Sequence, residues 1–202
     1  MAPHFSQAAE RNRHDIAPKL RARIQDGANV LEIASGTGQH ILHFSEVMPK
    51  IIWQPSDRSL EEFALRDKVV AAKRDNLLAP LQIDVMKFPD FEETYDAVYS
   101  ANCIHVMPSA NLEPFVVGAA KALKPGGMMM LYGPFKYDGR FTTESNEQFD
   151  AFLRGTYEDG GIRDFERVDE LAEANGMSFH SDTDMPANNQ FIIWRKALPE
   201  IE

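Results

Sequence analysis

One stretch of the chain decides its fold: Val30-Leu31-Glu32-Ile33-Ala34-Ser35-Gly36-Thr37-Gly38-Gln39-His40. It opens as an apolar run with strand character, and Gln39 begins a helical pattern that stops before Pro49. Gly36 and Gly38 lie in the turn between them, where the absence of a Cβ lets a ligand approach the backbone. The helix start adds free N–H groups and a partial positive charge. We therefore expect a ligand-binding unit at the start of an α/β sheet.

The same alternation of strand and helix continues along the chain. It predicts parallel βαβ units with helices on both faces of the sheet. Strands are expected at 29–34, 50–53, 81–85, 95–101 and 128–132, and helices at 39–47, 59–72 and from Ser109 or Asn111 to Leu123. Further helices are expected at 144–153 and 164–174, followed by strands at 177–180 and 190–194. The last two strands lie too close in sequence for a crossover helix, so they predict an antiparallel hairpin.

The chain is expected to form one domain, because 202 residues match the usual size of a single domain. Within residues 1–202 we expect an N-terminal helical cap at 1–28 and a Rossmann-like core at 29–202. The pattern over 5–24 is mostly helical and is interrupted at Pro18. Two interpretations of the cap remain open: it packs against the sheet, or it forms a lid over a ligand crevice.

Composition restricts the partners. The chain has 21 Lys and Arg against 31 Asp and Glu, a net charge of −10, which repels phosphate backbones and anionic lipid surfaces. We expect neither a nucleic acid nor a membrane as partner, and no pattern predicts an oligomeric state. No secretory signal is visible at residues 1–7, and the single Cys103 cannot form an internal disulfide. These features predict a cytoplasmic location.

The glycine turn differs from the dinucleotide fingerprint Gly-x-Gly-x-x-Gly, because Ile41 occupies the third glycine position. Glu32, two residues before the turn segment, would repel a pyrophosphate and would favour a cation such as an ammonium group. This charge favours S-adenosylmethionine (SAM) over NAD and disfavours an NAD-dependent oxidoreductase. The alternative for Glu32 is a carboxylate that only bonds nearby backbone or a surface lysine.

Two more acidic residues follow successive strands. Asp57 lies nineteen residues after Gly38, a spacing at which a carboxylate accepts ribose hydroxyls, although it could instead cap the next helix. Asp84 ends the third expected strand, where it or its neighbouring backbone could meet an adenine edge or simply form a turn. Open α/β sheets bind ligands at the carboxyl ends of their strands, so these groups indicate one site.

The segment after the fourth expected strand carries two polar residues, Asn102 and His105, in an otherwise apolar stretch. His105 could take a proton from a substrate, since histidine has a pKa of about 6.5, or it could be a hydrogen-bonded structural residue. Cys103 is expected in the core. His40 and His43 share a helix face without a third ligand, so no metal is expected.

These residues resemble class I SAM-dependent methyltransferases, with Ala34 in place of the first glycine of their glycine motif. The resemblance implies a Rossmann-like, seven-stranded, mostly parallel sheet with an antiparallel terminal hairpin and helices on both faces. It also implies SAM as cofactor and S-adenosylhomocysteine as its product. The implied cofactor-binding residues are Glu32, Ala34, Ser35, Gly36, Gly38, Asp57, Asp84, Val85 and Asn102.

A closer resemblance covers nearly the whole chain. It is to the methyltransferase-like family that includes methyltransferase-like protein twenty-six, and it supplies no substrate. The matching segments are Ala9–Asn12, Leu31–His40, Pro55–Asp57, Leu123–Gly127, Tyr132–Phe135, Ser145-Asn146, Gly161–Asp164 and Met185–Asn189.

We expect the methyl acceptor to be a small polar molecule, with His105 or Tyr132 as the base where the acceptor must lose a proton. Asparagine amides both donate and accept hydrogen bonds, although they also favour turns. Arg11 or Arg163 could hold a substrate carboxylate. The alternative function is a non-catalytic SAM-binding or partner-interaction module. The expected substrate-pocket residues are Arg11, Asn12, Tyr137, Asn146, Asn188 and Asn189.

Overall fold

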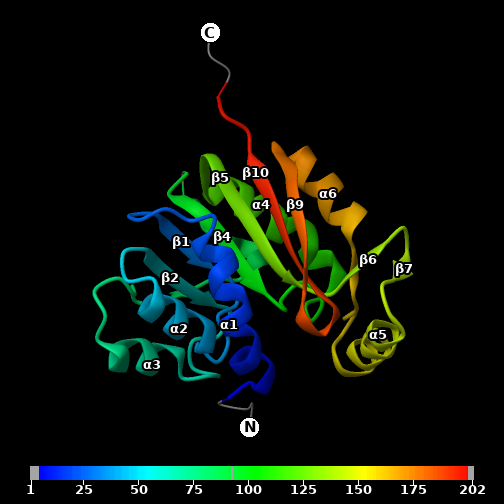
Figure 1. Ribbon diagram of the computed structural model, residues 1–202, viewed down its shortest axis with the longest axis horizontal. Coiled ribbons are helices and arrows are strands. Elements are labelled where there is room, and N and C mark those ends of the chain that lie inside the picture. Colours follow the sequence, from blue (N-terminus) through cyan, green and yellow to red (C-terminus); the bar gives the residue numbers. More distant parts are fainter. Residues whose placement is uncertain (1–4, 92, 200–202) are drawn as a thin grey trace.

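The computed structural model describes residues 5–91 and 93–199, which form a central seven-stranded sheet between two layers of helices (Figure 1). The strand order is β3-β2-β1-β4-β5-β10-β9. The chain changes direction across the sheet between β1 and β4, which is the kind of position where open α/β sheets bind ligands. The strands are β1 (Asn29–Glu32), β2 (Ile52–Asp57), β3 (Leu81–Gln82), β4 (Tyr95–Ala101), β5 (Leu123–Gly133), β9 (Met177–Met185) and β10 (Asn189–Lys196).

The strand directions confirm the predicted sheet. β1 pairs in parallel with β2 and β4, β2 with β3, and β4 with β5. β10 runs antiparallel to both β5 and β9, and the short helix η3 (Pro186–Asn188) joins the hairpin. Five parallel strands followed by an antiparallel hairpin therefore form one continuous sheet.

Alternation along the strands produces two hydrophobic cores. Val30 packs on the face covered by α1 (Gln7–Arg21), α2 (Gln39–Val47) and α3 (Leu65–Ala72). The adjacent Leu31 packs on the other face, under α4 (Leu112–Ala122) and α6 (Phe165–Ala174). Side chains alternate between the faces of a strand, so Glu32 points to the same side as Val30, toward α1 and α2.

A second, small sheet has the order β7-β6-β8 and was not predicted. Its strands are β6 (Phe135–Tyr137), β7 (Arg140–Phe141) and β8 (Arg163–Asp164). It supports α5 (Glu144–Thr156), which lies to the side of the main sheet (Figure 1). Thr143 caps this helix by accepting a hydrogen bond from the Asn146 N–H at 3.2 Å.

Several predicted boundaries are wrong for local reasons. α1 continues through Pro18, whose carbonyl accepts the N–H of Ala22 at 3.1 Å near the end of the helix. α3 begins at Leu65 rather than at residue 59, because Ala64 is left-handed (φ 51°). β3 stops before Asp84, whose side chain caps the 3₁₀ helix η1 (Val85–Lys87).

Two further boundaries differ near α4. The first residues of that predicted helix form a separate 3₁₀ turn, η2 (Ser109–Asn111). β5 already starts at Leu123, and a shift in its pairing with β4 accommodates the predicted turn at 124–127.

Candidate functional site

Backbone hydrogen bonds hold the segment after β1 between its two neighbouring strands. The N–H of Ile33 donates to the carbonyl of Tyr99 at 2.9 Å, on the β4 side. On the β2 side, the N–H of Ser35 donates to the carbonyl of Ser56 at 2.7 Å. The hydroxyl of Ser56 donates to the carbonyl of Glu32 at 2.7 Å. The glycine turn is therefore fixed at the carboxyl edge of the sheet.

Asp57 organises the glycine turn. Its Oδ2 accepts the N–H of Gly36 at 2.8 Å, and its Oδ1 accepts the N–H of Ser59 at 3.1 Å. Because α3 starts only at Leu65, Asp57 does not cap that helix. Each carboxylate oxygen keeps a second acceptor position, so the side chain remains able to bind ligand hydroxyls.

The backbone of the turn adopts conformations that favour glycine. Gly36 has φ 51°, and a Cβ added there would meet no atom within 4 Å, so the space beside it is open. Gly38 is also left-handed, at φ 77°, directly before α2. Ala34 has φ 61° despite its Cβ. The position where the methyltransferase motif has glycine therefore also needs a left-handed backbone in this chain.

Glu32 is a buried carboxylate with one unsatisfied oxygen. Its residue exposure is 2%, Oε1 lies 4.0 Å from Nδ1 of His40, and Oε2 has no hydrogen-bond partner within the described ranges. Burial raises the pKa of Glu32 to about 7, against a hydrogen bond from Ser35 that lowers it, and the charge of Asp57 raises it further. A cationic group brought next to Oε2 would supply the missing partner.

α1 is attached to the start of α2 beside this carboxylate. Nε2 of His40 and Oδ1 of Asn12 are 2.7 Å apart, and the Gln39 amide donates to Glu10 at 2.8 Å. Burial, together with the charges of His43 and Arg13, lowers the pKa of His40 to about 4. The His40 ring is therefore neutral at physiological pH.

The remaining predicted cofactor residues lie at the same edge of the sheet. Asp84 accepts the N–H of Met86 at 3.0 Å and so caps η1, while Val85 and Ala34 pack against the same apolar core. Asn102 is left-handed (φ 53°), and its N–H donates to the carbonyl of Tyr132 at 2.8 Å. Asp84 and Val85 thus follow β3, Ala34 follows β1, and Asn102 follows β4.

A cavity of about 500 Å³ opens next to this edge. We call it the α1–α5 cavity, because α1 and α5 line it together with the segments after β4 and before β10. It brings together six of the predicted residues. These are Arg11, Asn12, Asn102, His105, Asn146 and Asn189.

Two predicted pocket residues take other positions. Asn188 lies beside the cavity, and its carbonyl accepts a hydrogen bond from the Asn146 amide at 2.9 Å. Tyr137 belongs to the small sheet, where its hydroxyl donates to Asp182 and its ring stacks on Phe165 with centroids 5.6 Å apart. The cavity lining that the structure defines does not include Tyr137.

Sequence reasoning missed the aromatic side of the α1–α5 cavity. Phe149 and Phe152 of α5 and Tyr157 at its end line the cavity and are partly exposed. The spacing of three between the two phenylalanines places them on one helix face. That spacing was visible in the sequence, but their exposure was not.

The two candidate bases differ in their protonation. Burial, with the charge of Arg163, lowers the pKa of His105 to about 4, so its ring is neutral. Nδ1 of His105 is buried and has no hydrogen-bond partner in the described part of the chain. Burial raises the pKa of Tyr132, while the nearby amides of Asn12 and Asn189 lower it. Tyr132 therefore stays a neutral hydroxyl.

The two candidate arginines have different contacts, and Cys103 is a protonated thiol. Arg163 donates to the carbonyls of Ile104 at 2.9 Å and Asp159 at 3.0 Å, so it holds the segment after β4 in place. Arg11 has no hydrogen bond or ion pair with any described residue and lines the cavity. Burial raises the pKa of Cys103 to about 12, so its thiol stays protonated.

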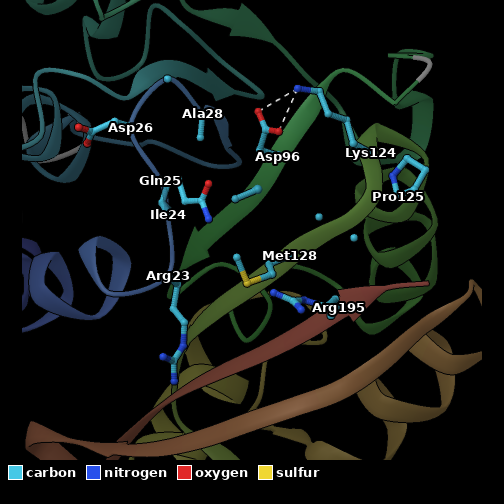
Figure 2. Close-up of a pocket in the computed structure, with 14 residues that line it drawn as sticks. Arg23, Ile24, Gln25, Asp26, Ala28, Asp96, Lys124, Pro125, Met128 and Arg195 are labelled. Carbon is cyan, nitrogen blue, oxygen red and sulfur yellow. Dashed lines mark hydrogen bonds and ion pairs between the residues drawn. The ribbon is translucent and has the colours of Figure 1, made fainter. Parts of the chain in front are cut away.

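A second cavity, of about 400 Å³, lies at the opposite, amino-terminal edge of the sheet (Figure 2). Arg23 and Arg195 line it, and so do Lys124 and Asp96, which form an ion pair between Nζ and Oδ2 at 2.9 Å. It contains none of the predicted site residues.

Among residues 5–91 and 93–199, no group of three His, Cys, Asp or Glu could hold a metal ion. None of the helices described is long and apolar enough to cross a bilayer.

Solved structures share this architecture. An O-methyltransferase family protein from Burkholderia thailandensis superimposes with a TM-score of 0.79 at 17% identity, covering 96% of this chain and 58% of its own. Human N-acetylserotonin methyltransferase in complex with SAM superimposes with a TM-score of 0.72 at 15% identity, covering 93% and 52%. This chain thus spans little more than half the length of these proteins. The fold is the Rossmann-like fold of class I methyltransferases, as predicted.

The family of the chain follows from its sequence. The chain belongs to the family described as Protein of unknown function (DUF938), whose model matches residues 3–196.

Proposed function

We propose that this chain is a SAM-dependent methyltransferase acting on a small polar molecule, and that its family includes methyltransferase-like protein twenty-six. The observation that carries the proposal is the unsatisfied Oε2 of Glu32, buried beside the glycine turn. A buried acceptor without a partner is costly, and the ammonium group of SAM would satisfy it. The fold is consistent with this cofactor.

The residues present fit the parts of SAM. Glu32 would receive the ammonium group, Asp57 the ribose hydroxyls, and the segment at Asp84 and Val85 the adenine. The open space at Gly36 would admit the ligand against the backbone. When bound, SAM would supply an electrophilic methyl group on its sulfonium sulfur, and the electron pair of the broken carbon–sulfur bond would stay on S-adenosylhomocysteine.

The chain's own contribution is chiefly alignment. Holding two reactants in line can supply about 7–11 kcal/mol of a barrier. Neutral His105, which lines the α1–α5 cavity, would take the proton that the acceptor loses. Tyr132 keeps its proton, so its hydroxyl would act as a hydrogen-bond donor to the acceptor molecule and not as a base.

Calorimetry with three ligands tests the cofactor assignment. SAM and S-adenosylhomocysteine carry the ammonium group, whereas methylthioadenosine lacks it. We expect the wild-type protein to prefer the first two, and Glu32→Gln to lose most of that preference. Glu46→Gln, which alters an exposed carboxylate paired with Arg74, is the matched control. Equal affinity of the wild type for all three ligands would contradict the role of Glu32, and no binding of any would contradict the function.

A non-catalytic SAM-binding module is the second candidate. It is favoured by the protonation of the two candidate bases, neither of which is a strong base at neutral pH, since burial lowers the pKa of His105 to about 4 and raises that of Tyr132. Incubation of the protein with labelled SAM and a metabolite extract separates the two. Label transferred to a small product supports the enzyme, and binding of SAM without any transfer supports the module.

A further inference from the structure

One wall of the α1–α5 cavity is aromatic and open to solvent. Phe149 and Phe152 are 37% and 58% exposed, and their rings stack with centroids 6.2 Å apart and planes 14° from parallel. Tyr157 is 41% exposed on the same cavity. Large apolar side chains gathered on a concave surface mark a binding site. Stacked rings of this kind fit a ligand with a flat apolar face.

Another wall carries a single positive charge. Among the described residues that line the cavity, only Arg11 is charged at neutral pH, and no described residue neutralises it. Arg11 is an exposed residue, so its guanidinium group is accessible to a ligand in the cavity. A guanidinium group binds a carboxylate through two parallel hydrogen bonds. One guanidinium without a second cation suits a singly charged carboxylate better than a dianionic phosphate.

One residue that lines the cavity has a buried ring nitrogen without a hydrogen-bond partner in the described part of the chain. Nδ1 of His105 has no partner among the described residues, although the residue is only 2% exposed. The ring lines the cavity and meets Phe149 edge to face with centroids 5.7 Å apart, and its Nδ1 lies on the side of Gly133, where an added Cβ would come within 3.3 Å of it. A neutral imidazole nitrogen can accept from or donate to a hydroxyl, depending on the tautomer.

We propose that the α1–α5 cavity binds a small aromatic acid that carries a hydroxyl group. Its ring stacks on Phe149 and Phe152, its carboxylate pairs with Arg11, and its hydroxyl bonds to Nδ1 of His105. The identification of this ligand as the methyl acceptor rests on the proposed function. The binding site itself rests on the cavity.

The test is calorimetric titration of the full chain with para-hydroxybenzoate, para-hydroxyphenylacetate and their neutral amides, with and without S-adenosylhomocysteine. We expect at least one acid to bind, and its amide to bind about tenfold more weakly because a charge-assisted pair is lost. Arg11→Gln should weaken the acid by a similar factor and leave the amide unchanged. Phe152→Leu should weaken both.

Matched surface variants serve as controls. Arg23→Gln removes an exposed arginine outside this cavity, and Phe179→Leu removes a phenylalanine that is 46% exposed on β9. Both should bind the acid as the wild type does. The inference is overturned if neither acid binds the folded wild type, or if Arg11→Gln binds the acid unchanged.

The same titrations separate this inference from the proposed function. Binding of S-adenosylhomocysteine without binding of either acid would overturn the inference and leave the function standing. Binding of an acid through Arg11 without binding of SAM or S-adenosylhomocysteine would overturn the function and leave the site standing.

Discussion

Oδ1 of Asn12 on α1 and Nε2 of His40 on α2 form a buried hydrogen bond of 2.7 Å. The other ring nitrogen of His40 faces Glu32 at 4.0 Å. A residue of the N-terminal helix is thereby linked, through one imidazole, to the carboxylate at the end of β1. The cap and the core are thus joined at the proposed cofactor site itself.

Removing this link should destabilise the protein. Asn12→Ala leaves the buried Nε2 of His40 without its partner, which we expect to lower the free energy of unfolding by about 1–3 kcal/mol. Asp15→Ala, at an exposed position on the same helix, should change it by less than about 0.5 kcal/mol. Urea denaturation measures both. Equal effects of the two substitutions would show that the hydrogen bond contributes nothing specific.

Glu32 should make stability depend on pH. Its folded pKa of about 7 exceeds its ordinary value of 4.5, so its stabilising contribution is complete below pH 4.5 and is lost as the pH rises through 7. The difference corresponds to about 3 kcal/mol. Relative to the wild type, Glu32→Gln should therefore gain stability between pH 5 and pH 8. Denaturation curves at both values measure this, and a gap that does not change with pH would refute it.

SAM affinity should rise with pH over the same range. The ammonium group of SAM would pair with ionised Glu32, so below pH 7 each unit of acidification should weaken binding about tenfold. In Glu32→Gln this dependence should disappear. Calorimetry from pH 5.5 to pH 7 tests it, and a wild-type affinity that stays constant would be the contrary result.

His105 should affect stability in the opposite direction. Burial lowers its pKa from 6.5 to about 4, so its contribution is present above pH 6.5 and is lost as the pH falls toward 4. We expect the wild type to lose about 3 kcal/mol from this group across that interval. His105→Gln should lose correspondingly less, as measured by thermal or urea unfolding at pH 7 and pH 4.5. Parallel pH profiles for both proteins would contradict the prediction.

Gly36 should be needed for binding more than for folding. Both Gly36 and Gly139 are left-handed (φ 51° and 72°), and a Cβ at either would meet no atom within 4 Å. Replacing each with alanine should therefore cost a similar amount, about 1–2 kcal/mol. Only Gly36→Ala should weaken SAM, because only that Cβ would enter the space beside the glycine turn. Equal SAM affinity of the two variants would argue against that position of the ligand.

The sequence predicted the central sheet because its signals are local. The apolar strand, Gly36, Gly38 and the helix start at Gln39 follow each other directly in the chain, and each can be recognised without knowing the tertiary structure. The terminal hairpin was predictable for the same reason, since its short connection excludes a crossover helix.

The parts that escaped prediction depend on distant contacts. Phe135–Tyr137 becomes a strand because it pairs with Arg163–Asp164, far along the chain, and this pairing carries Tyr137 away from the cavity. Ala64 has a left-handed backbone although it is not a glycine, so nothing in the sequence indicates this conformation. The spacing of Phe149 and Phe152 predicts that they share one face of a helix, but the buried face of an ordinary amphipathic helix has the same spacing. Their exposure depends on how the small sheet positions α5.

The small sheet and α5 lie between β5 and α6, whereas Glu32, the glycine turn and Asp57 all belong to the first third of the chain. The α1–α5 cavity takes its lining from both parts, because Arg11 and Asn12 come from α1 and Phe149 and Phe152 from α5. Substitutions in α5 can therefore reshape the cavity without altering any of the residues proposed to hold SAM.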